Sequence, residues 1–525
     1  MSDIVSEAPA QTGESRPDGP DPRDVRVAGA VAAAIALSVL WVAAALWRGA
    51  PFGPSALAEA MIRAAPGGVA TFFIEALGSW ARRLATIGAI GVSLGIGMEA
   101  LVATARRGGP ARPGIAGAIL AVLAGTASFV SPTAVPTIPA LAVALGAAYL
   151  AYVLASGRLL GKLATAELAA DGGRRRVIRA GLGAALGIAV SGTVLGWIAR
   201  AVSGGPDTDV NLVAPSVRAD VPSRTGFPAV EGISPEVTST ADHYVVDINL
   251  VQPTVEAADW NLKVFGAVDR ELDLSFRALQ QGFEVVQEYS VLCCVSNEVG
   301  GNLIGNSAWG GVRLADVLTE AGAGEGAFDV VFRAADGYSD SIPLTLAMEP
   351  QVLLAVSQND RPLTQEHGFP CRVRIASIYG MKNVKWLESI EVVETDYKGY
   401  WQERGWSDDA TVRTQSRIDV AGEEGSARRG QATWIAGVAW AGDRGISNVE
   451  VSTDGGSRWS EAEVREPISQ YSWCQWAYRW TPSEDGDVAV MCRATDGTGA
   501  TQTDDIAPPH PAGATGYHRV SVRVS

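Results

Sequence analysis

The sequence predicts a multi-domain chain: an N-terminal α-helical transmembrane bundle, a central α+β domain and a C-terminal all-β immunoglobulin-like sandwich. Three observations predict this order. Residues 1–202 contain 17 Lys+Arg against 11 Asp+Glu, whereas residues 203–525 contain 25 against 46, so the two halves suit different solvents. Apolar runs of about 20 residues, the length that crosses a bilayer, lie in the first half. Short alternating runs separated by turns fill the second half.

The composition excludes several classes of protein. With 525 residues and 47% apolar residues, the chain is too long and too apolar for a disordered segment or a small disulfide scaffold. The acidic second half has no long basic face, which argues against a nucleic-acid binder. All five cysteines and all four histidines follow residue 240, so thiol or metal chemistry belongs to that half.

The first half contains five apolar segments that we expect to span a membrane. They are Val27–Leu46, Leu84–Thr104, Ile115–Val135, Ile138–Ala155 and Ala180–Val202. They follow a polar tail, residues 1–26, which we expect to be disordered, cytoplasmic and retained rather than cleaved. The segment Pro51–Trp80 is apolar but contains Arg63 and Glu75, so we expect an interfacial or re-entrant piece, with a sixth span as the alternative.

The positive-inside rule predicts the orientation. With a cytoplasmic N-terminus, inside segments hold twelve Lys+Arg and outside segments five, so the chain after about residue 203 lies outside. The run Arg174–Arg179 (RRRVIR) is similar to a twin-arginine export signal; the alternative is a basic cluster that only fixes topology. No histidine lies in a span and Glu99 is the main ionisable residue there, which favours an anchor over a haem protein or a pump.

The second half predicts two β-rich domains after a linker at residues 203–240. The α+β domain, residues 241–405, has two expected helices, Ser275–Gln281 and Leu314–Ala321. Its expected strands are Tyr244–Leu250, Trp260–Val268, Val330–Arg333, Val352–Val356 and Arg372–Ile375. Residues 406–525 show regularly spaced strands, with a hairpin turn at Asp454-Gly-Gly, as is typical of an immunoglobulin-like sandwich.

Ordered motifs in residues 225–405 resemble the sulfite oxidase family of molybdopterin enzymes. They include Val291–Gly301 (VLCCVSNEVGG), Gly305–Leu318 (GNSAWGGVRLADVL), Asp336–Ser339 (DGYS), Glu366–Arg372 (EHGFPCR) and Asn383–Leu387 (NVKWL). The following sandwich resembles that family's molybdenum-cofactor dimerisation domain, and a membrane-anchored prokaryotic branch is the most similar. The resemblance implies a molybdenum–molybdopterin cofactor and a homodimer.

The resemblance implies one metal ligand, Cys294, which precedes Val-Ser-Asn in the first motif. A thiolate is a soft anionic ligand that suits molybdenum already held by a dithiolene. Cys293 would point to the opposite face of an extended segment, where we expect it to be a buried apolar thiol. Cys371 is also expected in the core, whereas a disulfide between Cys474 and Cys492 is allowed.

The resemblance also implies which residues bind the pterin and its phosphate. Such an anionic ligand, rich in donors and acceptors, needs basic and imidazole groups on rigid backbone. The expected cofactor-binding residues are His243, Tyr244, Asp336, His367, Arg372, Asn383, Val384 and Lys385.

The sequence departs from the family where sulfite would bind. Two substrate-holding arginines of sulfite oxidases fall at Val246 or Val245 and at Glu298 or Val299, and the catalytic tyrosine is replaced by Trp406. Loss of one charge-assisted contact to a buried anion costs roughly 1.5–3 kcal/mol. We therefore expect a small neutral substrate such as a sulfoxide or N-oxide instead of sulfite, with Trp406 as a catalytic candidate.

The sequence thus predicts a membrane-anchored, extracytoplasmic molybdopterin oxidoreductase that transfers oxygen atoms or electrons. It contains no haem-attachment CxxCH, no iron–sulfur cysteine set and no nicotinamide fingerprint, so we expect a separate redox partner, a cytochrome or a quinone-linked protein. One alternative is a catalytically silent, membrane-tethered binding or assembly module that keeps the fold. Another is a transporter with a sensor domain, which the charge-poor spans disfavour.

Overall fold

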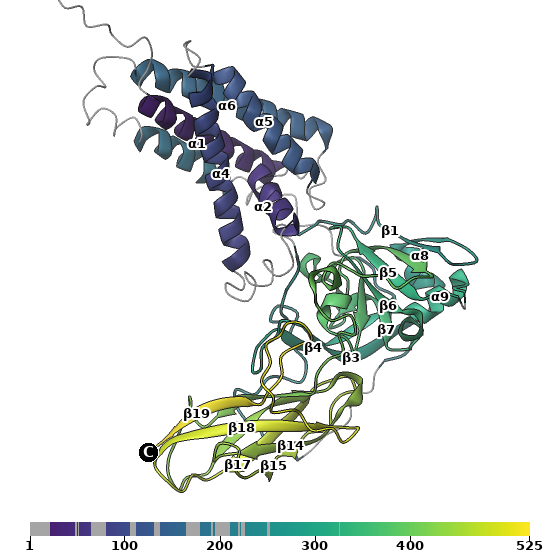
Figure 1. Ribbon diagram of the computed structural model, residues 1–525. Helices are drawn as coiled ribbons and strands as arrows, with labels where there is room; N and C mark the ends of the chain where they lie inside the picture. The colour runs from purple at the N-terminus through teal and green to yellow at the C-terminus, as the bar shows by residue number, and fades with distance from the viewer. Residues whose placement is uncertain are drawn as a thin grey trace, which may run out of the picture. The chain divides into compact units, whose positions relative to one another are not determined.

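A computed structural model describes residues 22–47, 50, 52–64, 80–105, 112–130, 137–163, 179–190, 193–194, 210–218, 221, 226–248, 252–324 and 326–525. The chain divides into two compact units (Figure 1). One consists of Met1–Ala64 with Leu77–Ser203, and the other of Ala65–Ala76 with Gly204–Ser525.

The first unit is helical. Its longer helices are α1 (Pro22–Leu46), α2 (Gly53–Ala64), α4 (Trp80–Ala105), α5 (Pro113–Val130) and α6 (Ile138–Leu163). Three stretches are long and apolar enough to cross a membrane, Arg23–Leu46, Leu84–Thr104 and Ile138–Gly161, and shorter apolar helices cover Pro113–Phe129 and Arg179–Val190. Three of the five predicted spans, Val27–Leu46, Leu84–Thr104 and Ile138–Ala155, therefore lie within helices of spanning length. The other two, Ile115–Val135 and Ala180–Val202, overlap the shorter apolar helices over their described residues. The arginines at 174–176 lie outside the described residues. The predicted interfacial or re-entrant segment Pro51–Trp80 contains helix α2, and its residues 65–79 lie outside the described residues.

Small residues let the helices of the bundle approach closely. A Cβ on Gly97 of α4 would lie 2.6 Å from the Cβ of Ala33 on α1, and the Tyr152 hydroxyl of α6 donates to the Gly97 carbonyl at 2.6 Å. Arg26 Nε and Glu99 Oε1 form an ion pair at 3.2 Å. This pair brings the start of α1 and the end of α4 together, as expected for antiparallel neighbours.

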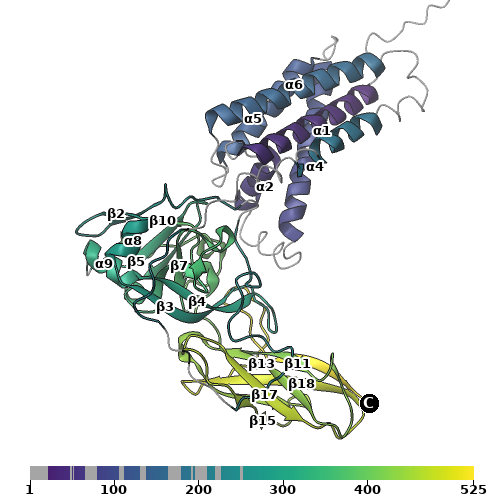
Figure 2. The same cartoon turned by 180° about the vertical axis from the view of Figure 1, so that it is seen from behind.

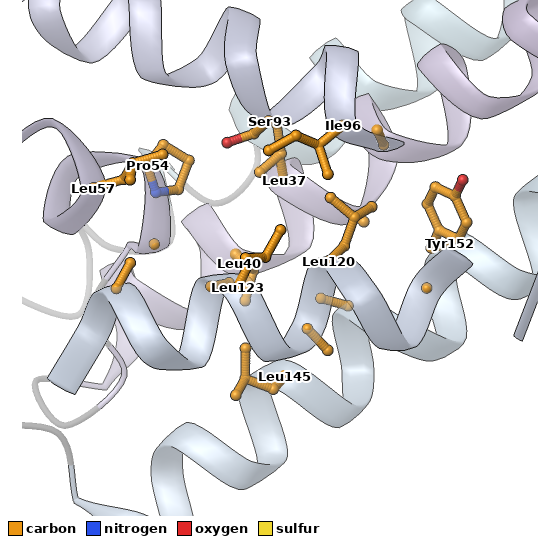
Figure 3. Close-up of a pocket in the computed structure, with 18 of the residues that line it drawn as sticks. Leu37, Leu40, Pro54, Leu57, Ser93, Ile96, Leu120, Leu123, Leu145 and Tyr152 are labelled. Carbon is orange, nitrogen blue, oxygen red and sulfur yellow. The ribbon is translucent and has the colours of Figure 1, made fainter. Parts of the chain in front are cut away.

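The bundle contains an apolar cavity of about 240 Å³ (Figure 3). Leu37, Leu40, Leu57, Ile96, Leu120 and Tyr152 are among its lining residues. None of the described residues that line it is an acid, a base or a histidine.

The central part of the second unit has two sheets. The first has the order β2-β1-β10-β5-β6, formed by β1 (Asn261–Gly266), β2 (Leu272–Ser275), β5 (Asp329–Ala334), β6 (Ser339–Pro343) and β10 (Leu387–Val393). The second has the order β3-β4-β7-β8, with β9 pairing to β7; its strands are β3 (Val285–Cys293), β4 (Ile304–Arg313), β7 (Val352–Gln358), β8 (Arg361–Pro362) and β9 (Arg372–Ile375). Helices α8 (Phe276–Gly282), α9 (Leu314–Ala321) and α10 (Leu344–Ala347) accompany them (Figure 1). The α+β prediction is confirmed, and α9 has the predicted bounds.

One predicted strand is wrong. Residues 244–248 of the segment predicted from Tyr244 to Leu250 form no strand but an extended loop that follows a turn, in which His243 N–H donates to the Ser239 carbonyl at 3.0 Å. Val245 and Val246 remain 37% and 40% exposed. The alternating apolar pattern therefore meets no sheet face here. Parts of the predicted linker pack on the same unit, since Ser216 N–H donates to the Val285 carbonyl at 2.9 Å.

The C-terminal part consists of two β-sheets around one apolar core (Figure 2). The first has the order β11-β13-β17-β16, with β11 (Gln415–Ala421), β13 (Thr433–Trp440), β16 (Glu463–Val464) and β17 (Cys474–Trp480). The second has the order β12-β19-β18-β14-β15, with β12 (Ser426–Ala427), β14 (Ile446–Ser452), β15 (Ser460–Glu461), β18 (Gly486–Asp496) and β19 (His518–Val524). The predicted Asp454 turn joins β14 to β15. The immunoglobulin-like assignment stays a prediction.

The cysteines of this part lie in different sheets. Cys474 is on β17 and Cys492 on β18; both are free thiols buried in the shared core. Cys371 is fully buried in the core of the central part, as expected.

Candidate active site

Strand β3 ends at two adjacent cysteines with different surroundings. Cys293 belongs to the hydrophobic core, whereas Cys294, 7% exposed, is not part of it. A turn follows immediately, in which Cys294 N–H donates to the Leu303 carbonyl at 2.9 Å and the Cys294 carbonyl accepts from Asn297 N–H at 3.0 Å. Burial raises the pKa of the Cys294 thiol. This thiol is therefore protonated at neutral pH until a cation binds it.

Two histidines and a tryptophan form an aromatic cluster near this strand. The His243 ring centroid lies 5.5 Å from that of His367 and 5.7 Å from that of Trp309, which is on β4. Trp309 Nε1 donates to the Ser290 carbonyl of β3 at 3.2 Å, which fixes the indole. Burial lowers the pKa of His243 to about 3 and that of His367 to about 4. Both imidazoles are therefore neutral at pH 7 and can donate and accept hydrogen bonds.

Arg372 extends this cluster from β9. Its guanidinium carbon lies 5.3 Å from the Trp309 ring centroid. Nη1 donates to the His367 carbonyl at 3.0 Å and Nη2 to the Asn383 carbonyl at 3.1 Å. Burial lowers the pKa of Arg372 to about 10, so the side chain remains a cation at pH 7.

Lys385 adds an ammonium group. Its Nζ donates to Asp247 Oδ2 at 3.2 Å and to the Glu366 carbonyl at 3.1 Å, and it lies 4.3 Å from the Trp386 ring centroid. Burial lowers the pKa of Lys385 to about 8, although Asp247 opposes this shift. Gly368, at φ +103°, allows Lys385 to lie close to the main chain at this position, because a Cβ on residue 368 would lie 2.9 Å from the Lys385 Cβ.

Tyr244 lies between this cluster and the cysteines. Its ring stacks on His243 at 5.3 Å between centroids. A Cβ on Gly380 would lie 2.7 Å from the Tyr244 hydroxyl and 3.3 Å from the Cys293 carbonyl. Burial raises the pKa of Tyr244, and the Cys294 and Cys293 thiols raise it further. Tyr244 therefore stays protonated and remains a donor.

Three other predicted residues have internal partners. Asp336, 2% exposed, accepts from Tyr338 N–H at 2.9 Å. Asn383 Oδ1 accepts from Ile375 N–H at 2.7 Å and its Nδ2 donates to two carbonyls, while Val384 lies in the core. Cofactor contacts from these residues stay predictions, and the bonds of Asn383 are those of a structural hub.

Trp406 occupies a different aromatic group. It is 5% exposed, and its ring lies edge-on to His510 at 5.1 Å and to Trp401 at 6.0 Å between centroids. Its Nε1 is buried without a hydrogen-bond partner in the described part of the chain. These ring contacts are separate from those around Trp309, and a catalytic role for Trp406 stays a prediction.

Two members of the cluster were missed by the sequence reasoning, Trp309 and Arg374. Trp309 lies inside the motif Gly305–Leu318. A large aromatic residue within a stretch of small residues is the sequence feature that could have indicated it. Arg374 follows Arg372 by two residues on β9, so the two side chains leave the same strand face. Arg374 is 1% exposed, with its guanidinium 5.7 Å from the Trp309 ring centroid.

The residues present fit a metal–pterin cofactor with an anionic phosphate. His243 Nε2 and Arg372 Nε are buried, and neither has a hydrogen-bond partner among the described residues. Gly305 lets the His243 imidazole pack directly against β4, because a Cβ there would lie 2.6 Å from His243 Cδ2. Cys294 offers a soft ligand, and Arg372 and Lys385 offer positive charge for a phosphate.

Comparisons with known proteins identify the family. The oxidoreductase molybdopterin binding domain matches residues 249–401, and the Mo-co oxidoreductase dimerisation domain matches residues 410–525. The chain is 33% identical over 257 residues to mitochondrial sulfite oxidase of Rattus norvegicus, which covers 42% of this chain and 47% of that protein. It is 35% identical over 147 residues to the uncharacterized oxidoreductase YuiH of Bacillus subtilis, covering 28% of this chain and 72% of that protein.

A solved structure, the sulfane dehydrogenase SoxCD from Paracoccus pantotrophus, is similar with a TM-score of 0.48 at 21% identity, over 56% of this chain and 82% of that chain. The chain spans about half the length of the mammalian relatives it matches. Both matched domains and the relatives agree: the chain belongs to the sulfite oxidase family of molybdenum-dependent oxidoreductases, and its cofactor is molybdenum bound to molybdopterin.

Proposed function

We propose that this protein is a membrane-anchored, extracytoplasmic molybdopterin oxidoreductase that acts on a small, weakly charged substrate other than sulfite. One observation carries the proposal. The buried Cys294 thiol lies at the end of β3, and Trp309, whose indole is tied to the same strand, holds His243 and Arg372 at ring-contact distance. A soft ligand and a fixed guanidinium on one rigid sheet, with a neutral imidazole beside them, suit redox chemistry at a metal held by an anionic pterin.

The residues of the site have different roles. Cys294 is the protein's thiolate ligand, and its proton leaves when the metal binds. Arg372 and Lys385 hold the phosphate end, while neutral His243 and His367 hydrogen-bond to the pterin. When bound, the cofactor supplies a centre that exchanges an oxygen atom, or electrons with protons, with the substrate. Tyr244 stays protonated and offers a donor on the thiol side.

The proposed substrate follows from the side chains at the predicted arginine positions. Val245, Val246 and Glu298 are exposed. Arg417 lies near the loop that contains Glu298, because it donates to the Gly301 carbonyl at 2.8 Å. Its Nε also donates to Asp419 at 2.7 Å, so its positive charge is already paired with a carboxylate. Apolar and acidic groups disfavour a dianion such as sulfite. Sulfoxides and N-oxides, which are polar but neutral, fit better.

The proposed location rests on the helical unit. Three helices are long and apolar enough to span a membrane, and two shorter apolar helices overlap the other expected spans. The Arg26–Glu99 pair fits antiparallel spans whose shared end is cytoplasmic. An odd number of spans then puts the catalytic part outside. We further propose that the Arg174–Arg179 run directs export of this part with its cofactor in place, that electrons pass to a separate cytochrome or quinone-linked protein, and that the chain forms a homodimer, as the dimerisation-type domain suggests.

The test is cofactor and turnover analysis of the detergent-purified full chain from a host that makes molybdopterin. Molybdenum is measured by mass spectrometry and the pterin by fluorescence after oxidation. Turnover is then measured with sulfoxides, N-oxides and sulfite using artificial electron carriers. We expect about one molybdenum per chain and turnover of a neutral substrate. Rapid sulfite oxidation would contradict the substrate proposal, and well-folded protein without molybdenum or pterin would favour the silent binding module.

A further inference from the structure

Arg374 is a buried cation that the family resemblance does not assign to the cofactor. Only 1% of it is exposed, and burial lowers its pKa to about 9, with Arg372 acting in the same direction. A second guanidinium beside Arg372 is costly in a core unless hydrogen bonds compensate for lost water. Its hydrogen bonds therefore show what the side chain does.

The guanidinium of Arg374 connects two segments that are distant in sequence. Nη2 donates to the Val291 carbonyl on β3, three residues before Cys294. Nη1 donates to Asn383 Oδ1 at 3.0 Å, two residues before Lys385. One rigid planar group thus joins the strand that leads to the thiol with the segment that leads to the ammonium.

Asn383 is the point that this group holds. Besides Arg374, Ile375 N–H donates to its Oδ1 at 2.7 Å and Arg372 Nη2 donates to its carbonyl at 3.1 Å. Its own Nδ2 donates to the carbonyls of Ile378 and Tyr379 at 3.3 and 3.2 Å. The two arginines of β9 therefore fix both the main chain and the side chain of the residue that begins the Asn383–Lys385 segment.

We propose that Arg374 is a positioning residue that sets the spacing between Cys294 and Lys385, the two ends of the cofactor site. The inference rests on the proposed roles of those two residues. A lysine cannot replace this function fully, because an ammonium is a point charge and does not present a planar fork to two fixed acceptors. Arg374 itself touches neither the metal nor the substrate in this proposal.

The experiment compares the full chain with three variants, Arg374→Met, Arg374→Lys and the control Arg361→Met. Arg361 is an exposed arginine on β8. Each protein is made in hosts with and without molybdopterin synthesis. Molybdenum per chain is measured, together with the difference in thermal unfolding midpoint between cofactor-loaded and cofactor-free protein. That difference reports binding alone, because a purely structural change moves both midpoints equally.

We expect the molybdenum content of Arg374→Met to be at least about tenfold below wild type, which is the effect typical of removing a residue that orients a metal ligand. We also expect this variant to lose the difference between the two unfolding midpoints. Arg374→Lys should fall between this variant and wild type, and Arg361→Met should equal wild type. Wild-type molybdenum and midpoint difference in Arg374→Met would overturn the proposal. Wild-type molybdenum content in Arg374→Lys would also overturn the proposal, because a positive charge without the planar guanidinium would then be sufficient. If Arg374→Met does not fold, Arg374→Lys alone tests the proposal.

The same measurements separate this inference from the proposed function. Wild-type protein without molybdenum refutes the proposed function. Wild-type protein with molybdenum, and Arg374 variants that bind it equally well, refutes only the role of Arg374.

Discussion

Two groups of charged side chains in the central domain differ in how folding satisfies them. The cofactor cluster consists of His243, His367, Arg372, Arg374 and Lys385, and one of its three cations, Lys385, is paired with the carboxylate of Asp247. In it the two guanidiniums donate to carbonyl and amide oxygens, and three buried nitrogens, His243 Nε2, Arg372 Nε and Arg374 Nε, have no partner in the described chain.

The ion-pair cluster consists of Asp340, Lys382, Lys398 and Asp408. Lys382 Nζ donates to Asp340 at 3.1 Å and to Asp408 at 2.8 Å, and Lys398 Nζ donates to Asp408 at 2.6 Å. Here cations and carboxylates alternate, so the cluster is complete as folded. Charged side chains that pair with opposite charges stabilise the fold, whereas buried cations with unsatisfied hydrogen-bond donors indicate a binding site.

The largest expected effect comes from removing the proposed metal ligand, Cys294, next to the cofactor cluster. Cys294→Ser should abolish turnover, because a hydroxyl does not replace a soft thiolate on molybdenum. Cys293→Ser, one residue away in the core, should keep turnover and lower the free energy of unfolding by about 1–3 kcal/mol. Turnover and molybdenum content of both variants are measured beside their circular dichroism. Unchanged turnover in Cys294→Ser would refute the ligand assignment.

The next effect breaks the ion-pair cluster. Lys382→Met leaves Asp340, a fully buried carboxylate, without its cation, and should lower the free energy of unfolding by about 3–5 kcal/mol. Chemical unfolding of the full chain in detergent measures this. Adding Asp340→Asn should recover part of the loss, since burial already raises the pKa of Asp340 and favours a neutral group there. A loss below about 1 kcal/mol would show that the pair contributes little.

Acid should affect the cofactor cluster more than the ion-pair cluster. The folded pKa values of His243 and His367 lie below their ordinary value of 6.5, so the folded state binds fewer protons than the unfolded state between about pH 4 and 6.5. The contribution of these neutral histidines to the free energy of unfolding is complete above pH 6.5. As the pH decreases below this value, it falls by about 1.4 kcal/mol per pH unit for each histidine. Cofactor-free protein measured from pH 7 to 5 tests this. His243→Asn should remove one such slope, and an unchanged slope would contradict a neutral buried His243.

The sequence predicts the order of domains better than it predicts which residues lie next to one another in the folded chain. Helix α9 and strand β9 have the predicted bounds because periodicity and turn residues are local signals. The predicted strand from Tyr244 failed, since a strand needs a neighbour that local sequence does not reveal. Arg374 was missed for the same reason: its partners Val291 and Asn383 are close only in the folded chain.

The smallest expected effect sharpens the comparison within the ion-pair cluster itself. Lys398 shares Asp408 with Lys382, but 46% of its side chain is exposed against 3% for Lys382. Lys398→Met should lower the free energy of unfolding by only about 0.2–1 kcal/mol, and about 1 M salt should remove most of that difference by screening. The loss in Lys382→Met should persist in the same salt, because its partner Asp340 is out of reach of solvent ions. Equal losses in the two variants would mean that the number of ion pairs, and not their burial, determines how much the cluster stabilises the fold. Unequal losses would show that burial makes a Lys–Asp pair necessary for folding, whereas the same pair at the surface contributes little.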